Sequence, residues 1–294
     1  MGMRKTSYVF AMDGTMLTVD IGSPVRRRTR RDVARVAMVE TPKSQYAQIA
    51  AELRERIDGG TYPPGSSLPS ETRLADEFGV TRVTINKALT LLRASGDVKV
   101  RRGSDTRVRS LPRIPRDAKR RYAARQEGTG AGEVEARRLS LESKTQYREI
   151  ARVPAPPAVA ETLRLGKRED TLVRRRVLYA NGEPTQIADS YFPWSIVKGD
   201  KALMREEVGK GGSYSRLAEL GHGPVRFTED VTVRVPDDAE QRTLELEATQ
   251  PVFEIWHVAY TADDRPVEVC IHVMPGHLWT LKYDWDDETA TTGP

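Results

Sequence analysis

The residues best suited to chemistry lie between positions 82 and 93, where polar side chains recur at helical spacing. Arg82 and Asn86 are four residues apart, so they share one face of a predicted helix. On a helix that lies in a DNA major groove, arginine pairs with guanine O6 and N7, and asparagine pairs with adenine N6 and N7. The spacing therefore indicates a surface that reads base edges.

The elements that must position this surface follow from periodicity and capping signals. Apolar residues recur at helical spacing in three segments, 46–57, 74–78 and 85–92. Ser70 and Thr81 are suitable N-caps for the second and third of these helices. Two short alternating segments follow, 98–101 and 106–109, joined by a basic turn. This order predicts a winged helix-turn-helix over residues 41–110.

The charge distribution supports a nucleic-acid-binding module in the same region. Residues 41–125 carry 18 basic and 9 acidic side chains, whereas residues 126–294 carry 21 and 29. A basic segment joined to an acidic one is typical of a DNA-binding domain fused to a domain of another kind. The single cysteine, Cys270, excludes an internal disulfide and a cysteine-rich metal centre, which favours a cytoplasmic location. No segment approaches the ~18 apolar residues of a membrane-spanning helix.

The segment from Tyr62 to Leu89 resembles the signature of GntR-type transcription regulators. It contains Leu-Pro-Ser-Glu, Phe-Gly-Val-Thr-Arg and an Ala-Leu pair at the family's spacing, and the resemblance covers about residues 43–109. Thr72 and Asn86 stand where the family often has arginine, so the operator sequence does not follow from the family. The spacing and the resemblance together predict DNA contacts at Ser70, Thr72, Arg73, Thr81, Arg82, Thr84, Asn86, Lys87, Arg101, Arg102 and Gly103.

Three segments are predicted to lie outside the folded domains. Residues 1–40 have few apolar side chains and a basic run, so we expect a disordered basic extension; Met38, just before the first helix, is a possible natural start. Residues 111–132 combine prolines, basic side chains and glycines, which predicts a linker. Residues 289–294 are expected to form a disordered tail.

Residues 133–288 contain an internal repeat. Each copy has a short helix, a long alternating strand, a tight turn and a returning strand. Two such hairpins predict an antiparallel sheet with helices on one face, an α+β domain, and a ligand pocket between the halves. The repeat is seen where Leu163, Leu165, Val177 and Tyr179 recur 81 positions later as Leu244, Leu246, Val258 and Tyr260.

Residues 139–285 resemble the UTRA effector-binding domain of the HutC subgroup. The resemblance is carried by Arg174-Arg-Arg-Val-Leu-Tyr-Ala-Asn-Gly-Glu-Pro and by Asp189-Ser-Tyr-Phe-Pro. It implies a chorismate-lyase-like fold with a small-molecule pocket. Leu178 and Met274 replace polar residues of the family pattern, which argues against assuming a phosphosugar. The positions matched to effector binding are Arg174, Arg176, Ser213, Tyr214 and Glu268, and Ser213 and Tyr214 open a predicted helix, whose N-terminus favours anions.

These features together predict a homodimeric bacterial repressor, released from a palindromic operator by a small-molecule effector, for which an anion is a candidate. We expect no enzyme activity, no metal, no cofactor and no membrane contact. Two alternatives stay open: a plasmid-type maintenance or transfer regulator without a small effector, and a lyase-like enzyme. The sequence lacks a Ser-His-Asp spacing, a P-loop and a dinucleotide-binding fingerprint, which argues against the enzyme.

Overall fold

The computed structural model describes residues 6–10, 16–20, 44–100, 105–117, 135–136 and 138–285. The chain divides into two units, Met1–Lys43 and Ser44–Pro294. In the first unit β1 (Thr6–Phe10) pairs antiparallel with β2 (Met16–Asp20), which differs from the extension without structure expected there. Both strands are rich in β-formers, and the sequence between them includes Asp13-Gly14, a strong hairpin signal. The remaining residues of this extension, and the tail 289–294, lie outside the described residues.

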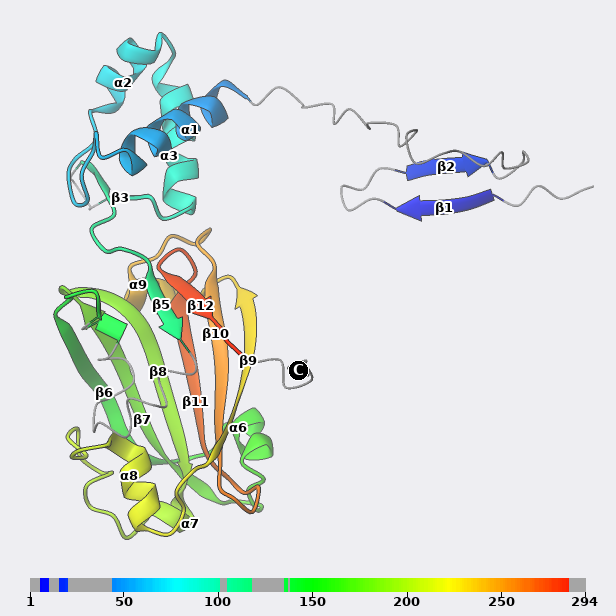
Figure 1. Ribbon diagram of the computed structural model, residues 1–294, viewed down its shortest axis with the longest axis vertical. Helices are drawn as coiled ribbons and strands as arrows, with labels where there is room; N and C mark the ends of the chain where they lie inside the picture. The colour runs from blue at the N-terminus through cyan, green and yellow to red at the C-terminus, as the bar shows by residue number, and fades with distance from the viewer. Residues whose placement is uncertain are drawn as a thin grey trace, which may run out of the picture. The chain divides into compact units, whose positions relative to one another are not determined.

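The predicted winged helix-turn-helix is present in the second unit (Figure 1). It consists of α1 (Gln45–Asp58), α2 (Glu71–Phe78), α3 (Arg82–Ala94) and the hairpin of β3 (Val98–Val100) with β4 (Thr106–Val108). One apolar core joins all five elements, with Leu53, Leu74, Ile85, Leu92, Val98 and Val108 buried in it. The apolar stripes read from the sequence are therefore the stripes that pack together.

The caps of α2 and α3 lie where the sequence predicts them. Ser70 accepts a hydrogen bond from the backbone N–H of Arg73 at 3.3 Å, and Thr81 accepts one from Thr84 at 3.3 Å. Gly79 ends α2 in the left-handed conformation, with φ of 62°. These caps fix the short turn between the two helices and thereby the direction of α3 relative to α2.

The segment after the hairpin is not a simple linker. Residues of β5 (Ile114–Asp117) pair in parallel with β12 (Trp279–Lys282) near the other end of the chain. Leu111 and Ile114 are buried in an apolar cluster with Met274 and Trp279. Pro112 and Pro115 suggested an irregular linker. The strand forms nevertheless, because β5 is a short edge strand of four residues, and an edge strand tolerates a proline. The rest of the predicted linker, residues 118–132, lies outside the described residues.

The sheet domain is built on the duplication predicted from the sequence. Its six strands are antiparallel in the order β6-β7-β8-β11-β10-β9, so each half contributes three neighbouring strands (Figure 1). The strands are β6 (Ser143–Pro154), β7 (Asp170–Ala180), β8 (Glu183–Pro193), β9 (Arg226–Arg234), β10 (Val252–Tyr260) and β11 (Pro266–Pro275). Asn181 and Gly182, both with positive φ, form the β7–β8 turn as an Asn-Gly hairpin requires.

Helices cover both faces of this sheet, whereas the sequence predicted them on one face. The repeated helices α6 (Pro157–Thr162) and α9 (Asp238–Leu244) pack on the apolar face, through Val159 and Leu244. The opposite face meets α7 (Trp194–Val197) and α8 (Gly212–Glu219). These two helices belong to an insertion outside the repeat, so the repeat pattern held no information on where they pack.

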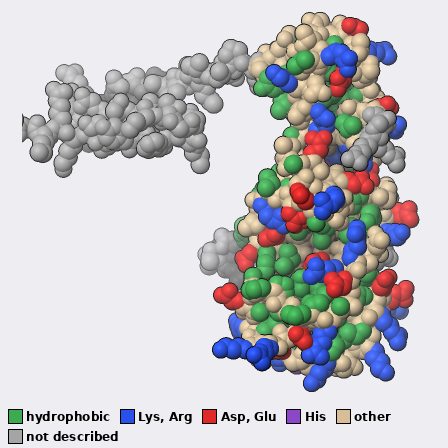
Figure 2. Space-filling view, turned by 180° about the vertical axis from the view of Figure 1, so that it is seen from behind, with side chains coloured by type: hydrophobic (Ala, Val, Ile, Leu, Met, Phe, Trp, Pro, Cys, Tyr) green, Lys and Arg blue, Asp and Glu red, His purple; other side chains and the backbone are tan. Residues whose placement is uncertain are grey.

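Apolar side chains gather over the middle of the sheet domain on the side seen in Figure 2, with charged side chains around them. In the part of the chain that the structure describes, no helix has the length and apolar character needed to cross a membrane.

Candidate nucleic-acid interface and ligand site

The outward face of α3 presents the two predicted base-reading residues together. Arg82 and Asn86 are both exposed, and both contact Glu71 at the start of α2. Asn86 Nδ2 donates to Glu71 Oε1 at 3.1 Å, and Arg82 Nη2 lies 3.5 Å from Glu71 Oε2. One carboxylate therefore holds both side chains side by side. Val83, 66% exposed beside them, adds an apolar surface of the kind that contacts a thymine methyl group.

The other predicted DNA contacts divide into three groups. Ser70, Thr81 and Thr84 are engaged in capping, and the hydroxyl groups of Thr81 and Thr84 lie 3.1 Å apart. The side chains of Thr72, Arg73 and Lys87 are exposed near them on α2 and α3. Arg101, Arg102 and Gly103 lie outside the described residues, so the turn of the wing is a prediction only.

Arg174 and Arg176 project from β7 onto the sheet face that meets α8, but they differ in their bonding. Arg174 is 1% exposed and donates to the backbone carbonyls of Leu203, Arg205 and Glu206 and to the Tyr147 hydroxyl. Burial lowers the pKa of its guanidinium. Its donors are committed to the loop before α8, so Arg174 shapes the site instead of offering itself to a ligand.

Arg176 reaches across the sheet toward the second half of the repeat. Its Nη1 donates to Ser190 Oγ at 3.0 Å, and its Nη2 lies 3.9 Å from Cys270 Sγ on β11. Burial works to lower the pKa of this guanidinium, but charge interactions with Cys270, Tyr147 and Glu268 outweigh it and raise the pKa. The group is therefore a partly buried, permanent positive charge at the junction of the two halves.

Tyr214 and Ser213 lie in the first turn of α8, as predicted. Tyr214 Oη is 2.9 Å from His257 Nε2, and its ring packs 5.5 Å from the ring of Phe227. Gly211 before this helix has φ of 78°, and a Cβ there would meet Ser215 Oγ at 1.8 Å. Glycine is thus required at the point where the chain turns to bring Tyr214 over the sheet.

Glu268, Cys270 and His272 alternate along β11 onto the same face, and all three are buried. Residue pairing places His257 of β10 directly opposite Cys270. His272 Nδ1 is 2.6 Å from Gln186 Nε2, and burial raises the pKa of the Cys270 thiol to about 11. No group of His, Cys, Asp and Glu side chains within the described ranges is arranged to hold a metal ion.

Three residues of this face were not predicted from the sequence. Glu229 of β9 lies 3.2 Å from His257 Nδ1, and Arg116 of β5 forms a salt bridge with the same carboxylate. Tyr147 of β6 packs under Arg174, 4.8 Å from the guanidinium carbon to the ring centroid. Strand alternation gives a signal for Glu229 once β9 is recognised, but nothing in the sequence near Arg116 indicates burial.

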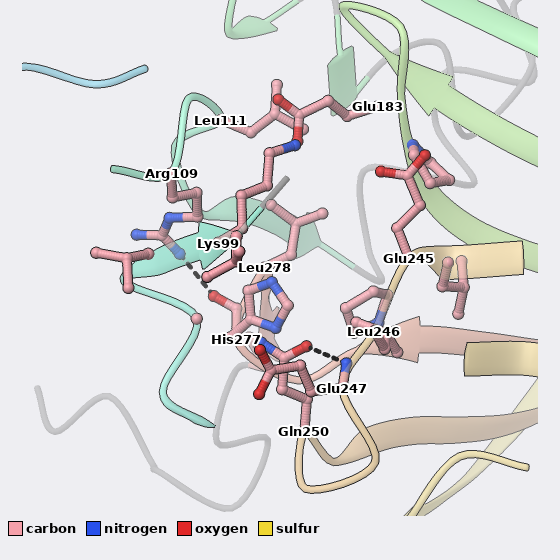
Figure 3. A pocket seen from close by; sticks show the side chains of 16 residues that line it. Lys99, Arg109, Leu111, Glu183, Glu245, Leu246, Glu247, Gln250, His277 and Leu278 are labelled. Carbon is pink, nitrogen blue, oxygen red and sulfur yellow. Dashed lines mark hydrogen bonds and ion pairs between the residues drawn. The ribbon is translucent and has the colours of Figure 1, made fainter. Parts of the chain in front are cut away.

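A pocket lies where the winged domain meets the sheet domain (Figure 3). Arg109 Nη1 donates to the carbonyl of His277 at 2.8 Å, and Gln250 Nε2 donates to the carbonyl of Arg93 at 2.7 Å. Burial, with Arg109 and Arg113 nearby, lowers the pKa of His277 to about 4. Its ring is so close to Gly96 that a Cβ there would lie 2.2 Å from it. This pocket contains none of the predicted effector residues.

Comparisons with known proteins identify both domains. The family "Bacterial regulatory proteins, gntR family" matches residues 45–108, and the UTRA domain matches residues 138–278. An uncharacterised HTH-type regulator of Rhizobium meliloti, RB1450, is 30% identical over 239 residues, covering 80% of this chain and 93% of its own. The mannosyl-D-glycerate system repressor MngR of Escherichia coli is 25% identical, covering 77% and 89%.

A solved structure confirms the fold. PhnF from Mycobacterium smegmatis has a TM-score of 0.52 and 23% identity, covering 81% of this chain and 99% of its own. The α+β architecture, a winged helix-turn-helix followed by an antiparallel sheet domain, is therefore shown. The chain belongs to the GntR family of bacterial transcriptional regulators, with the GntR–UTRA domain architecture of its HutC-type members.

Proposed function

We propose that the protein is a homodimeric repressor that leaves its operator when a small anionic molecule binds the sheet domain. The observation that carries this proposal is the pairing of an exposed base-reading surface on α3 with a partly buried positive charge, Arg176, at the junction of a duplicated sheet. The name of the relative MngR, a repressor of a transport and metabolism system, supports repression as the sign of regulation.

The DNA-binding half of the proposal rests on Arg82, Asn86 and Glu71. Glu71 accepts one amide hydrogen of Asn86, which leaves the second amide hydrogen and the amide oxygen for the N7 and N6 edge of adenine. Arg82 beside it is suited to guanine. We therefore expect each half-site to contain a guanine and an adenine within a few base pairs, and the two half-sites to be about one helical turn apart.

The effector-binding half rests on Arg176, Tyr214 and Glu268. A partly buried arginine forms strong hydrogen bonds with carboxylate or phosphate oxygens, and the N-terminus of α8 adds a favourable dipole. Glu268 on the same face would accept hydrogen bonds from hydroxyl groups of the ligand. Such a ligand causes release of DNA only to the extent that it binds the DNA-free conformation of the protein more tightly than the DNA-bound conformation.

Dimerisation through the sheet domain is part of the same proposal. Figure 2 shows apolar side chains gathered over the middle of this domain. On the sheet face that carries α6, half-buried Trp256 and Ile271 pack against the apolar core. Light scattering on the purified protein tests this point, because a monomer at micromolar concentration contradicts it.

The function is tested by mapping binding sites genome-wide with the purified protein and footprinting the strongest fragment. An inverted repeat near a promoter is the expected result, and the neighbouring genes then supply candidate anions for thermal-shift assays. Arg176→Ala should still bind this operator but should lose release by the anion, whereas Arg175→Ala, altered in an exposed pair with Glu149, should keep it. Operator binding without any stabilising anion would favour the regulator that has no small effector.

A further inference from the structure

Arg116 is a buried charge in a segment expected to be a solvent-exposed tether. It is 2% exposed, and its guanidinium forms a salt bridge with Glu229, whose side chain is 9% exposed. Ile114, two residues earlier on the same face of β5, packs against Ile255 and Met274 of the main sheet. The strand is thus seated on the sheet by one apolar and one ionic contact.

Glu229 connects Arg116 to the proposed effector site through a series of partly buried hydrogen bonds. The carboxylate Oε1 that contacts Arg116 lies 3.2 Å from His257 Nδ1, and His257 Nε2 lies 2.9 Å from Tyr214 Oη. His257 is 4% exposed. Four side chains from β5, β9, β10 and α8 therefore form one continuous polar chain, and it begins at a residue of the proposed effector site.

The chemistry of these groups fixes the direction of the hydrogen bonds. An ionised carboxylate only accepts, so His257 must donate to Glu229 through Nδ1–H. A neutral imidazole then accepts at Nε2, so the Tyr214 hydroxyl donates to it. A ligand that accepts a hydrogen bond from the Tyr214 hydroxyl therefore replaces His257 Nε2 as the acceptor. This replacement changes the hydrogen bonding of His257, which orients Glu229.

Arg116, at the other end of this series of hydrogen bonds, is close in sequence to the DNA-binding domain. β4 ends at Val108, and Arg109, which donates to the carbonyl of His277, lies seven residues before Arg116. The backbone N–H of Ile114 donates to Leu278 at 2.8 Å, one residue beyond His277. The position of β5 and the contact between the two domains are therefore joined by a short, hydrogen-bonded stretch of chain.

We propose that Tyr214, His257, Glu229 and Arg116 form a relay that couples occupancy of the effector site to the seating of β5, and through β5 to the DNA-binding domain. Arg116 and Glu229 are positioning residues in this relay, since they act through His257. The inference rests on the proposed function for the identity of the two ligands, but the coupling itself is a property of the free chain.

The first test needs neither ligand. Tyr214→Phe in the full-length protein removes one hydroxyl at the far end of the relay and keeps the ring that packs on Phe227. Amide hydrogen exchange of the peptide covering residues 110–117 should become about three- to tenfold faster, which is the effect of weakening one hydrogen bond. Tyr179→Phe is the matched control, because it deletes a tyrosine hydroxyl that contacts Gln146 on the same sheet. Equal exchange in wild type and Tyr214→Phe overturns the relay.

The second test uses the operator duplex recovered by footprinting. Because coupling is reciprocal, Tyr214→Phe should change the operator Kd about fivefold, while Tyr179→Phe should leave it within twofold. Glu229→Gln, which keeps the shape of the side chain, should also speed amide exchange at residues 110–117 and change the operator Kd. If exchange at β5 responds but no duplex is bound selectively, the proposed function fails and the relay stands. If a duplex is bound and β5 is unaffected, the relay fails and the function stands.

Discussion

The two domains place their functional side chains in opposite environments. In the winged domain the core is apolar, and Arg82, with 68% of its side chain exposed, lies on the outside of α3. In the sheet domain Arg174 is buried and Arg176 is partly buried, on a face where charged and polar groups are hydrogen-bonded to one another. A residue that recognises DNA must reach out to a large partner, whereas a residue that binds a small molecule must enclose it. Function and stability are therefore separable in the first domain and coupled in the second.

The largest expected difference concerns Arg174. Arg174→Met leaves three backbone carbonyls and the Tyr147 hydroxyl without their shared donor, so we expect the free energy of unfolding of the sheet domain to fall by about 3–5 kcal/mol. Chemical denaturation followed by tryptophan fluorescence measures this. Arg175→Met, next to it on the same strand but half exposed, should cost less than about 1 kcal/mol. Equal costs would contradict the contrast between buried and exposed arginines.

A smaller effect is expected from the pH dependence of His277, at the contact between the domains. Its pKa is about 4 when folded and 6.5 when unfolded. As the pH falls from 6.5 to 4 the unfolded chain binds a proton that the folded chain does not, so stability is lost; below pH 4 this contribution is constant. Because His277 is partly exposed, we expect a loss of about 2–3 kcal/mol.

Denaturation at pH 7.5 and pH 4.5 measures this loss, and His277→Gln should remove it. Carboxylates titrate in the same pH window, so the quantity compared is the loss of stability between the two pH values, in the variant and in wild type. His222→Gln is the control, because His222 lies outside the domain contact. An identical pH dependence in His277→Gln and wild type would show that His277 is not buried at this contact.

Arg82→Ala should act on DNA binding alone. The side chain is exposed and held by a long contact to Glu71, so the melting temperature should stay within a degree or two of wild type. Specific operator binding should weaken by about 1–3 kcal/mol if Arg82 reads a base edge. Fluorescence anisotropy on operator and on random duplexes separates base reading from phosphate contact, because an equal loss on both shows that Arg82 holds only phosphate.

The smallest expected effect comes from the cap of α3. Thr81→Ala removes the acceptor for the Thr84 N–H and should lower stability by about 1 kcal/mol, with Thr81→Ser close to wild type. Thermal unfolding measures this. A loss of operator affinity in both variants, including the one that keeps the cap, would show that the threonine methyl group also contacts DNA.

Sequence patterns predicted the winged domain almost completely, because its information is local. The helices of residues 45–94 are defined by stripes of period 3.6, their caps by Ser70 and Thr81, and the end of α2 by Gly79. The duplicated sheet was also predicted, since each hairpin carries its own alternation and turn. The candidate DNA-contacting residues follow from the same local pattern, apart from those in the wing that the structure does not describe.

The sheet domain's site was predicted only in part. The resemblance indicated Arg174, Arg176 and Glu268, but it did not show that Arg174 donates its hydrogen bonds to backbone carbonyls while Arg176 reaches toward the other half of the repeat. The insertion that carries α8 has no repeat partner, so its packing on the opposite face was missed. The β1–β2 hairpin was not predicted, although its strands flank an Asp13-Gly14 pair in the sequence.

The sequence by itself determined the helices of the winged domain with their caps, the two paired hairpins of the duplicated sheet, and which face of α3 is polar. Only the tertiary structure decided that β5 pairs with β12, more than 160 residues later in the chain, and that Arg116 meets Glu229, which in turn contacts His257. Helix periods, caps and turns depend on neighbours within a few residues. The partner of a buried charge depends on how the whole chain packs, and the sequence does not distinguish a buried arginine from an exposed one.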